Sequence, residues 1–237
     1  MKKSTLGATL ILFIFMVLLA SAAATGILNE PFNKWSLDAA VRMLNHSPWA
    51  KQETFTRVIG GVGSGVSGER EIYSTFYLRF LSARPIREAY ARVQQIKHGY
   101  DKMSVDERLA FENFQQPNLD LDTSEFIIVS MSFRSNDPNQ ENTIRNFFRN
   151  QTVKTLRNKA FLSTPRHSQV EIVDYFPPSD ESVGAKFVFP RTINGTPVIS
   201  PTCSHITIEL LEIDRSVPDL RSTFTAGQMR VNGELIL

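Results

Sequence analysis

The sequence predicts an α+β fold, with an antiparallel β-sheet and several helices packed on it. Helical spacing of apolar residues is confined to the part of the chain before residue 152, and short strand-like runs follow it. Two Asn-Gly pairs, which accept positive φ at both turn positions, mark tight hairpins in that later part. A meander-rich C-terminal half, with the earlier helices on one face of the sheet, is the economical arrangement.

The N-terminus has the three-part layout of a secretory signal peptide. Lys2 and Lys3 precede an apolar run at residues 8–20, and the small residues 21–24 follow it. Cleavage before Thr25 leaves residues 25–237 as a single α+β domain in the periplasm or outside the cell. The alternative is an uncleaved membrane anchor, since a bilayer is spanned by roughly 20 apolar residues.

Composition narrows the class of protein. The formal charge is +2, and loss of Lys2 and Lys3 leaves equal numbers of cationic and anionic side chains. Such a chain lacks the positive charge that dominates nucleic-acid affinity, so a nucleic-acid partner is excluded. Cys203 is the only cysteine, and 17 phenylalanines contrast with 2 tryptophans. The fold must therefore rest on a phenylalanine-rich core rather than on disulfides.

The first half of the mature chain alternates helices with strands. Ser36 is placed to cap a short helix that ends near Asn45, and Pro85 fits the first turn of a second helix. Ser104 and Glu107 have capping-box spacing and predict a third helix. The remaining predicted elements are a strand at 53–59, a glycine- and serine-rich hairpin loop at 60–68, strands at 71–81 and 126–133, and a helix at 139–150.

Strands dominate the second half. Asn194-Gly195 and Asn232-Gly233 each predict a hairpin. The predicted strands span residues 152–162, 169–176, 186–191, 198–200, 205–213 and 228–237.

Residues 63–68 match G-x-G-x-x-G, the spacing that lets a backbone approach a pyrophosphate where a helix begins. A strand follows here instead, and the lysine strand and the H-R-D and D-F-G motifs of kinases are absent. Glycine and serine in this density favour a flexible hairpin tip.

Cys203 and His205 are the weak catalytic candidates. Two residues apart on a strand, their side chains would point to one face, and a thiol beside an imidazole can act as a nucleophile. An inert core thiol is the commoner outcome for a single cysteine, because cysteine is among the most often buried residues.

Asp120 and Asp122 are the weak metal candidates. With Asn118 they alternate, as do the first ligands of a calcium loop. Thr123 then stands in place of the loop glycine and Val129 in place of the bidentate glutamate, so a solvated turn is favoured. No other motif predicts a metal or cofactor.

Residues 145–159 interleave arginine and lysine with Phe147 and Phe148, as a polyanion or membrane-surface patch would require. The alternative is that the two phenylalanines belong to the core and the cations form a solvated face.

Several short motifs resemble a family of exported proteins of environmental bacteria, acidobacteria in particular. They are Trp35-Ser36-Leu37, Ser47-Pro48-Trp49-Ala50-Lys51, Ser82-Ala83-Arg84-Pro85-Ile86-Arg87, Val188-Phe189-Pro190-Arg191 and Met229-Arg230-Val231-Asn232-Gly233-Glu234-Leu235. This resemblance spans most of the mature chain and implies export from a bacterium. The family has no assigned activity, so the resemblance implies no functional residue.

Together these observations favour an exported protein of the bacterial envelope with a binding or structural role, whose partner is another envelope protein or a small molecule. Two alternatives stay open. One is a secreted hydrolase whose site a single sequence cannot assemble, and the other is a membrane-tethered accessory protein that retains its N-terminal segment.

Overall fold

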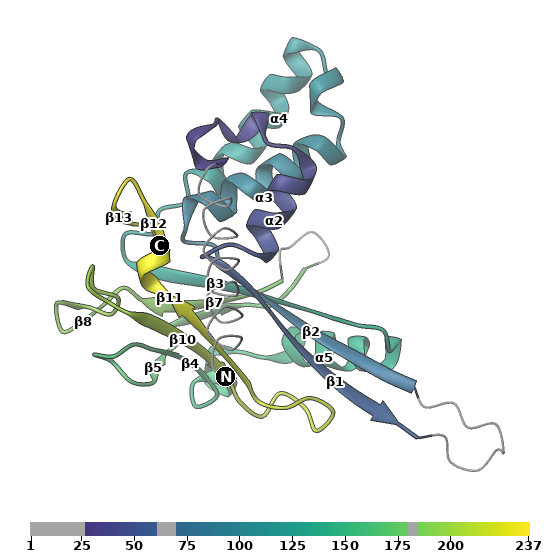
Figure 1. Ribbon diagram of the computed structural model, residues 1–237, viewed down its shortest axis with the longest axis vertical. Helices are drawn as coiled ribbons and strands as arrows, with labels where there is room; N and C mark the ends of the chain where they lie inside the picture. The colour runs from purple at the N-terminus through teal and green to yellow at the C-terminus, as the bar shows by residue number, and fades with distance from the viewer. Residues whose placement is uncertain (1–26, 61–69, 180–183) are drawn as a thin grey trace, which may run out of the picture.

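The computed structural model describes residues 27–60, 70–179 and 184–237, and it has the predicted α+β architecture (Figure 1). A five-stranded antiparallel sheet has the strand order β1-β2-β3-β7-β6, and a four-stranded antiparallel sheet has the order β11-β10-β4-β5. The strands of the first sheet are β1 (Ala50–Ile59), β2 (Arg70–Phe80), β3 (Phe126–Ser135), β6 (Asp174–Phe176) and β7 (Ala185–Pro190). Those of the second are β4 (Ala160–Ser163), β5 (Val170–Glu171), β10 (His205–Leu210) and β11 (Leu220–Thr225).

Three of the helices gather at one end of the molecule, at the top of Figure 1. They are α2 (Leu37–Asn45), α3 (Arg84–Lys97) and α4 (Val105–Leu119). The predicted caps are confirmed: the Ala39 N–H donates to Ser36 Oγ over 3.1 Å, and Ser104 and Glu107 form a reciprocal capping box. Of the remaining helices in the described ranges, α5 (Pro138–Asn150) packs against β3, and α6 (Val153–Leu156) is a single turn. Short 3₁₀ turns span Ile27–Asn29, Phe32–Lys34, Tyr100–Lys102 and Ala226–Gln228.

Both Asn-Gly hairpins are confirmed. β8 (Thr192–Ile193) pairs with β9 (Thr196–Pro197), and β12 (Arg230–Val231) pairs with β13 (Glu234–Leu235). The backbone φ is 49° and 74° at the first Asn-Gly pair and 51° and 85° at the second. Asparagine and glycine tolerate this left-handed conformation better than other residues, so the two turns are fixed by local sequence.

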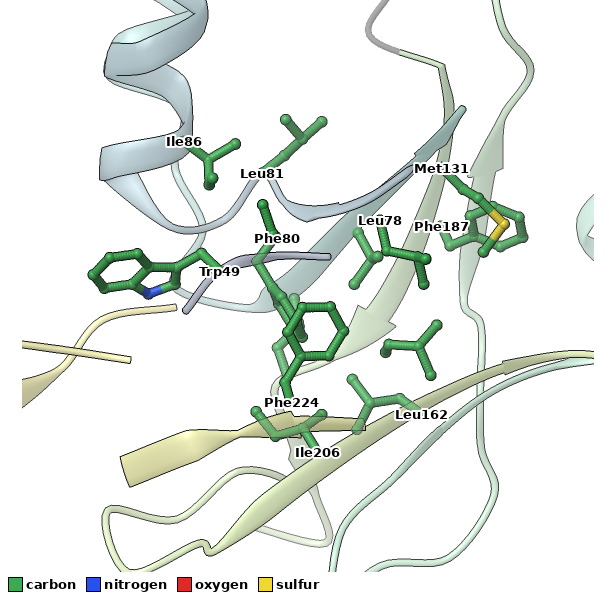
Figure 2. Close-up of a cluster of buried hydrophobic side chains, with 14 of the residues drawn as sticks. Trp49, Leu78, Phe80, Leu81, Ile86, Met131, Leu162, Phe187, Ile206 and Phe224 are labelled. Atoms are coloured by element: carbon green, nitrogen blue, oxygen red, sulfur yellow. The ribbon is translucent and has the colours of Figure 1, made fainter. Parts of the chain in front are cut away.

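The two sheets enclose one phenylalanine-rich core, as composition predicts. Phe80 of β2 and Phe224 of β11 are fully buried and meet edge to face, with ring centroids 4.9 Å apart (Figure 2). Leu78 and Met131 extend the contact from the first sheet, and Ile206 extends it from the second (Figure 2). Alternate residues of β1, β2 and β3 point away from this core, so the other face of the large sheet is polar.

Several predicted elements are wrong. Residues 153–156 are helical rather than extended, because the side chains of Thr152 and Thr155 cap each other's backbone N–H groups at the start of α6. The predicted strand 169–176 is divided between β5 and β6, which lie in different sheets. No strand spans 198–200, since β9 ends at Pro197.

The predicted α+β class is confirmed, and the structure adds a second antiparallel sheet to it. β11 was not predicted, and with β10 it builds a second sheet that covers the core face of the first. Its burial alternates strictly from Leu220 to Thr225, but its inward positions include Ser222, so the apolar period is interrupted. A polar residue on the inward face hid the strand from a hydrophobicity pattern.

Two predicted segments lie outside the described residues: the signal peptide at 1–24 and all but the first residue of the glycine loop at 60–68, including its G-x-G-x-x-G match. The hairpin that the loop joins is confirmed, because Ile59 pairs with Arg70. Within the described ranges, no helix is both long enough and apolar enough to span a membrane.

Truncation of Phe224 tests the contact between the sheets. We expect Phe224→Ala to lower the free energy of unfolding by about 3–5 kcal/mol, because it removes apolar contacts and leaves a cavity. Urea denaturation followed by fluorescence measures the change. Phe176→Ala is the control, since Phe176 is 50% exposed, and it should change the free energy by about 0.5 kcal/mol or less. Equal effects of the two substitutions would contradict the assignment.

Candidate functional site

A groove of about 510 Å³ lies between the second half of β1 and the loop that joins β10 to β11. It is lined by residues 54–57 of β1, by Ser74 of β2 and by loop residues 215–218. β1 is the edge strand of the large sheet, and with β2 it forms a long hairpin that projects from the body of the molecule (Figure 1). The groove therefore follows a sheet edge.

The hydrogen-bond register shows which backbone groups of β1 face the groove. The Phe80 N–H donates to the Trp49 carbonyl over 3.0 Å, and Trp49 continues the β1–β2 register by one residue. Because bonding direction alternates along an antiparallel strand, odd-numbered residues of β1 bond to β2 and even-numbered residues point outward. The N–H and C=O groups of Thr54 and Thr56 thus face the free edge, and nothing in the described part of the chain bonds to them.

The first half of β1 is closed by the second sheet. Lys51 Nζ donates to the Thr223 carbonyl, and Ser222 Oγ donates to Glu53 Oε1 over 2.6 Å. Both partners are on β11, so these two contacts hold the strands together at Lys51 and Glu53. From Thr54 onward β1 faces loop residues 215–218 across the groove, and no described residue pairs with its outer edge.

The two walls of the groove are connected behind its floor by Gln140 of α5. Its side-chain oxygen accepts a 2.6 Å hydrogen bond from Ser74 Oγ, and its amide nitrogen donates to the Ser216 carbonyl over 3.1 Å. Gln140 is buried, so these bonds are shielded from water. They tie the loop to the large sheet and set the position of the wall opposite β1.

The floor of the groove is apolar and its rim is cationic. Phe55 meets the buried ring of Phe76 edge to face with centroids 6.2 Å apart, and Val217 is buried on the loop side. Arg57 and Arg215 are both exposed lining residues. Within the described ranges neither arginine forms an ion pair, in contrast to Arg134 and Arg145, which both bind Glu141 at 2.8 Å.

Cys203 and His205 lie near each other but are not arranged for catalysis. The Cys203 thiol donates to the backbone carbonyl of His205 over 3.1 Å, while the His205 imidazole is exposed and its Nδ1 contacts Ser204 Oγ at 2.9 Å. Burial raises the pKa of the Cys203 thiol, which disfavours the thiolate. Cys203 also precedes β10 rather than lying on it, so the shared strand face predicted for the pair is wrong.

Asp120 and Asp122 lie at the end of α4 and in the turn after it. Asp120 Oδ2 accepts a 2.6 Å bond from Gln116, and Asp122 Oδ1 accepts the Ser124 N–H over 2.9 Å. The bond from the Ser124 N–H lowers the pKa of the exposed Asp122 carboxyl. No group of three or more histidine, cysteine, aspartate or glutamate side chains among the described residues is placed to hold a metal ion.

The cation–aromatic stretch at 145–159 is divided between core and surface. Phe148 is buried and Phe147 packs on the core, while Arg157 lies 3.7 Å from Glu171 and Lys159 lies 2.8 Å from Glu212. These neighbours support the alternative of a solvated face over a polyanion patch.

Sequence reasoning missed a buried arginine on the polar face of the large sheet. Arg79 Nε donates to the Leu44 carbonyl over 2.6 Å, and its terminal nitrogens bond to Asn45 Oδ1 and Ser132 Oγ. Its guanidinium also stacks on the rings of Tyr77 and Tyr90. Arg79 therefore ends α2 and fixes it to β2 and β3, which is a structural role. The alternation of side chains along β2 could have predicted that Arg79 lies on this face. No sequence pattern identifies the groups to which it bonds.

Comparison with known proteins gives no relative: no family model matches the chain, and no curated protein or solved structure is similar enough to count as a match. The resemblance to exported acidobacterial proteins therefore stays a prediction. The groove has to be interpreted from its own geometry.

The reactivity of Cys203 follows from its raised pKa. We expect iodoacetamide to label the folded protein more slowly at neutral pH than the urea-unfolded chain, because less thiolate is present. The pH midpoint of labelling should lie above the ordinary value of about 8.5. Mass spectrometry measures the rate, and His205→Ala should leave it unchanged. A midpoint below that value which rises in His205→Ala would restore the nucleophile hypothesis.

Proposed function

We propose that the protein is an exported, non-enzymatic binding protein of the bacterial envelope, and that its ligand is an extended segment of polypeptide laid along β1. The observation that carries this proposal is the groove beside Thr54 and Thr56, whose outward N–H and C=O groups have no hydrogen-bond partner among residues 27–60, 70–179 and 184–237. An added strand would satisfy these groups, and a sheet edge bordered by a groove is the usual setting for such recognition.

The supporting argument is energetic. Each outward backbone group can form a main-chain hydrogen bond worth about 0.5–1.5 kcal/mol, and the apolar floor adds burial of ligand side chains. Several such bonds give affinity with little dependence on sequence, and the groove walls supply the selectivity.

Proline at position 56 tests strand addition from the protein side. Thr56→Pro removes one outward N–H and leaves the inward ladder to β2 intact, because edge strands accept proline where the N–H faces solvent. We expect it to weaken binding of an end-capped peptide, Thr-Leu-Thr-Glu-Thr-Leu-Thr, by about tenfold or more, since a bond is lost and the ring obstructs the ligand backbone. Calorimetry with the purified protein measures the affinity. Thr56→Ala keeps the N–H and should bind normally.

The same question can be asked without changing the protein, in case Thr56→Pro does not fold. In an added strand, alternate amides face β1 and the others face solvent. N-methylation of the threonine amides should abolish binding if the ligand is antiparallel, and N-methylation of the leucine and glutamate amides if it is parallel. Equal effects of the two methylation patterns, or no binding of any peptide, would sink the proposal.

The export part of the proposal rests on residues 1–24 and has its own test. We expect N-terminal sequencing of the protein from a fractionated native host to give a start near Thr25 in a soluble envelope fraction, because small residues at 22 and 24 suit a signal peptidase. Recovery of an intact Met1 in the membrane fraction would replace this with a tethered protein.

A further inference from the structure

The side chains of the groove carry information about the ligand beyond its extended form. Phe55 and Arg57 are two residues apart on β1, and the β1–β2 register places them opposite Ser74 and Ile72 on the core side of the sheet. Side chains of directly opposed residues share a face. Ligand residues opposite Phe55 and Arg57 would therefore also be two apart and would point to the same side.

The charge of the groove is uniformly positive among its lining residues. Arg57 approaches from β1 and Arg215 from the opposite wall, and no carboxylate lines the groove. The nearest acid in the sequence of that wall is Asp214, whose Oδ1 accepts the Ser216 N–H over 2.8 Å. Hydrogen bonds from the side chain and N–H of Ser216, with smaller contributions from the N–H and the charge of Arg215, hold the pKa of the Asp214 carboxyl below its usual value. Asp214 is therefore engaged mainly with Ser216.

The other acids close to the strand are also occupied. Glu53 accepts the Ser222 hydroxyl at the closed end of the groove, and Glu71 accepts the Tyr73 hydroxyl. Glu71 pairs with Val58, whose side chain lies on the opposite face of the strand from Arg57. Arg57 is thus left without a counter-ion among the described residues. Arg215 is attracted electrostatically to the neighbouring Asp214 but forms no ion pair with it, so both guanidinium groups remain available where a ligand side chain would lie.

The apolar part of the groove is next to this cationic part. Phe55 and Val217 form the floor from the two walls, and Pro218 extends it on the loop side. An aliphatic side chain opposite Phe55 would be removed from water there, while a carboxylate opposite Arg57 would reach both arginines. Guanidinium groups bind carboxylates through charge-assisted hydrogen bonds, which are stronger than neutral ones.

We propose that the ligand is an acidic peptide segment in which an apolar residue and a glutamate or aspartate are separated by one residue. The apolar side chain lies on Phe55 and Val217, and the carboxylate lies between Arg57 and Arg215. This inference rests on the proposed strand addition to β1 and specifies the chemistry of the added strand.

Three peptides that differ at one position test the inference. Each is the end-capped Thr-Leu-Thr-X-Thr-Leu-Thr, with glutamate, glutamine or lysine at X, so that leucine flanks X in either strand direction. We expect the glutamate peptide to bind about five- to thirtyfold more tightly than the glutamine peptide, and the lysine peptide to bind most weakly. The preference should shrink as salt is raised, because both arginines are exposed.

Charge reversal in the protein provides the matched comparison. The double variant Arg57→Glu and Arg215→Glu should invert the order, so that the lysine peptide binds most tightly. Both positions are exposed, so the fold should be kept, and circular dichroism checks this. Lys154→Glu is the control, since it is an exposed cation on α6 that does not line the groove, and it should leave the preference unchanged.

The outcomes separate the two proposals. Equal binding of all three peptides, still abolished by Thr56→Pro, would overturn the acidic ligand and leave strand addition standing. A glutamate preference that is insensitive to both Thr56→Pro and N-methylation would be unspecific charge attraction and would overturn both. Self-association abolished by Thr56→Pro, with no peptide bound, would also overturn both and would identify a second copy of this chain as the occupant of the edge.

Discussion

The structure depends on the contact between its two sheets. Phe80 and Phe224 meet at the centre of this contact, and the buried residues around them form a cluster that runs from the helices at one end to α5. Each sheet alone would expose a complete apolar face, so neither is stable without the other.

The geometry of the β1 edge follows from this contact between the sheets. Among the described residues, the contacts that the second sheet makes along β1 include hydrogen bonds only in the first half of that strand, at Lys51 and Glu53. Beyond that point, no described residue pairs with the outer edge of β1.

Local signals in the sequence predicted the elements whose conformation is decided locally. The caps at Ser36 and Ser104 and the two Asn-Gly turns depend on contacts between residues that are neighbours in the sequence. A local sequence pattern is therefore enough to predict them. The wrong predictions concern segments whose conformation depends on contacts with distant parts of the chain. β11 carries Ser222 on its inward face, which is acceptable only because Glu53 of the other sheet accepts its hydroxyl. The helical turn at α6 shows the reverse case, in which a local cap at Thr152 overrides a strand-like run.

The candidate site could not have been predicted from motifs, because no chemically distinctive residue defines it. Cys203 and His205 attracted attention by residue type, yet the thiol is bonded to a carbonyl group rather than to the imidazole. Threonine, phenylalanine and arginine are among the residues that line the groove, and its two walls come from distant parts of the chain. Arg57 on one wall and Val217 on the other are 160 residues apart in the sequence. The one usable signal is the strand-like run at residues 53–59, before the glycine loop. Whether that strand is an edge depends on the order β1-β2-β3-β7-β6, which no sequence pattern reveals.

An open edge on a long strand is costly to a soluble protein, because it can pair with any exposed strand. Edges are usually blocked by proline, by a bulge or by inward charges. β1 pairs with β2 without interruption from Ala50 to Ile59 and contains no proline, so only its charged residues on the core side, such as Arg57, remain to protect it. The charges beside it are selective. Arg57 and Arg215 disfavour basic segments and the same arginines of a second copy of this chain. A surface that discourages self-pairing while it leaves Thr54 and Thr56 accessible is better explained by a ligand of opposite charge than by an accident of folding.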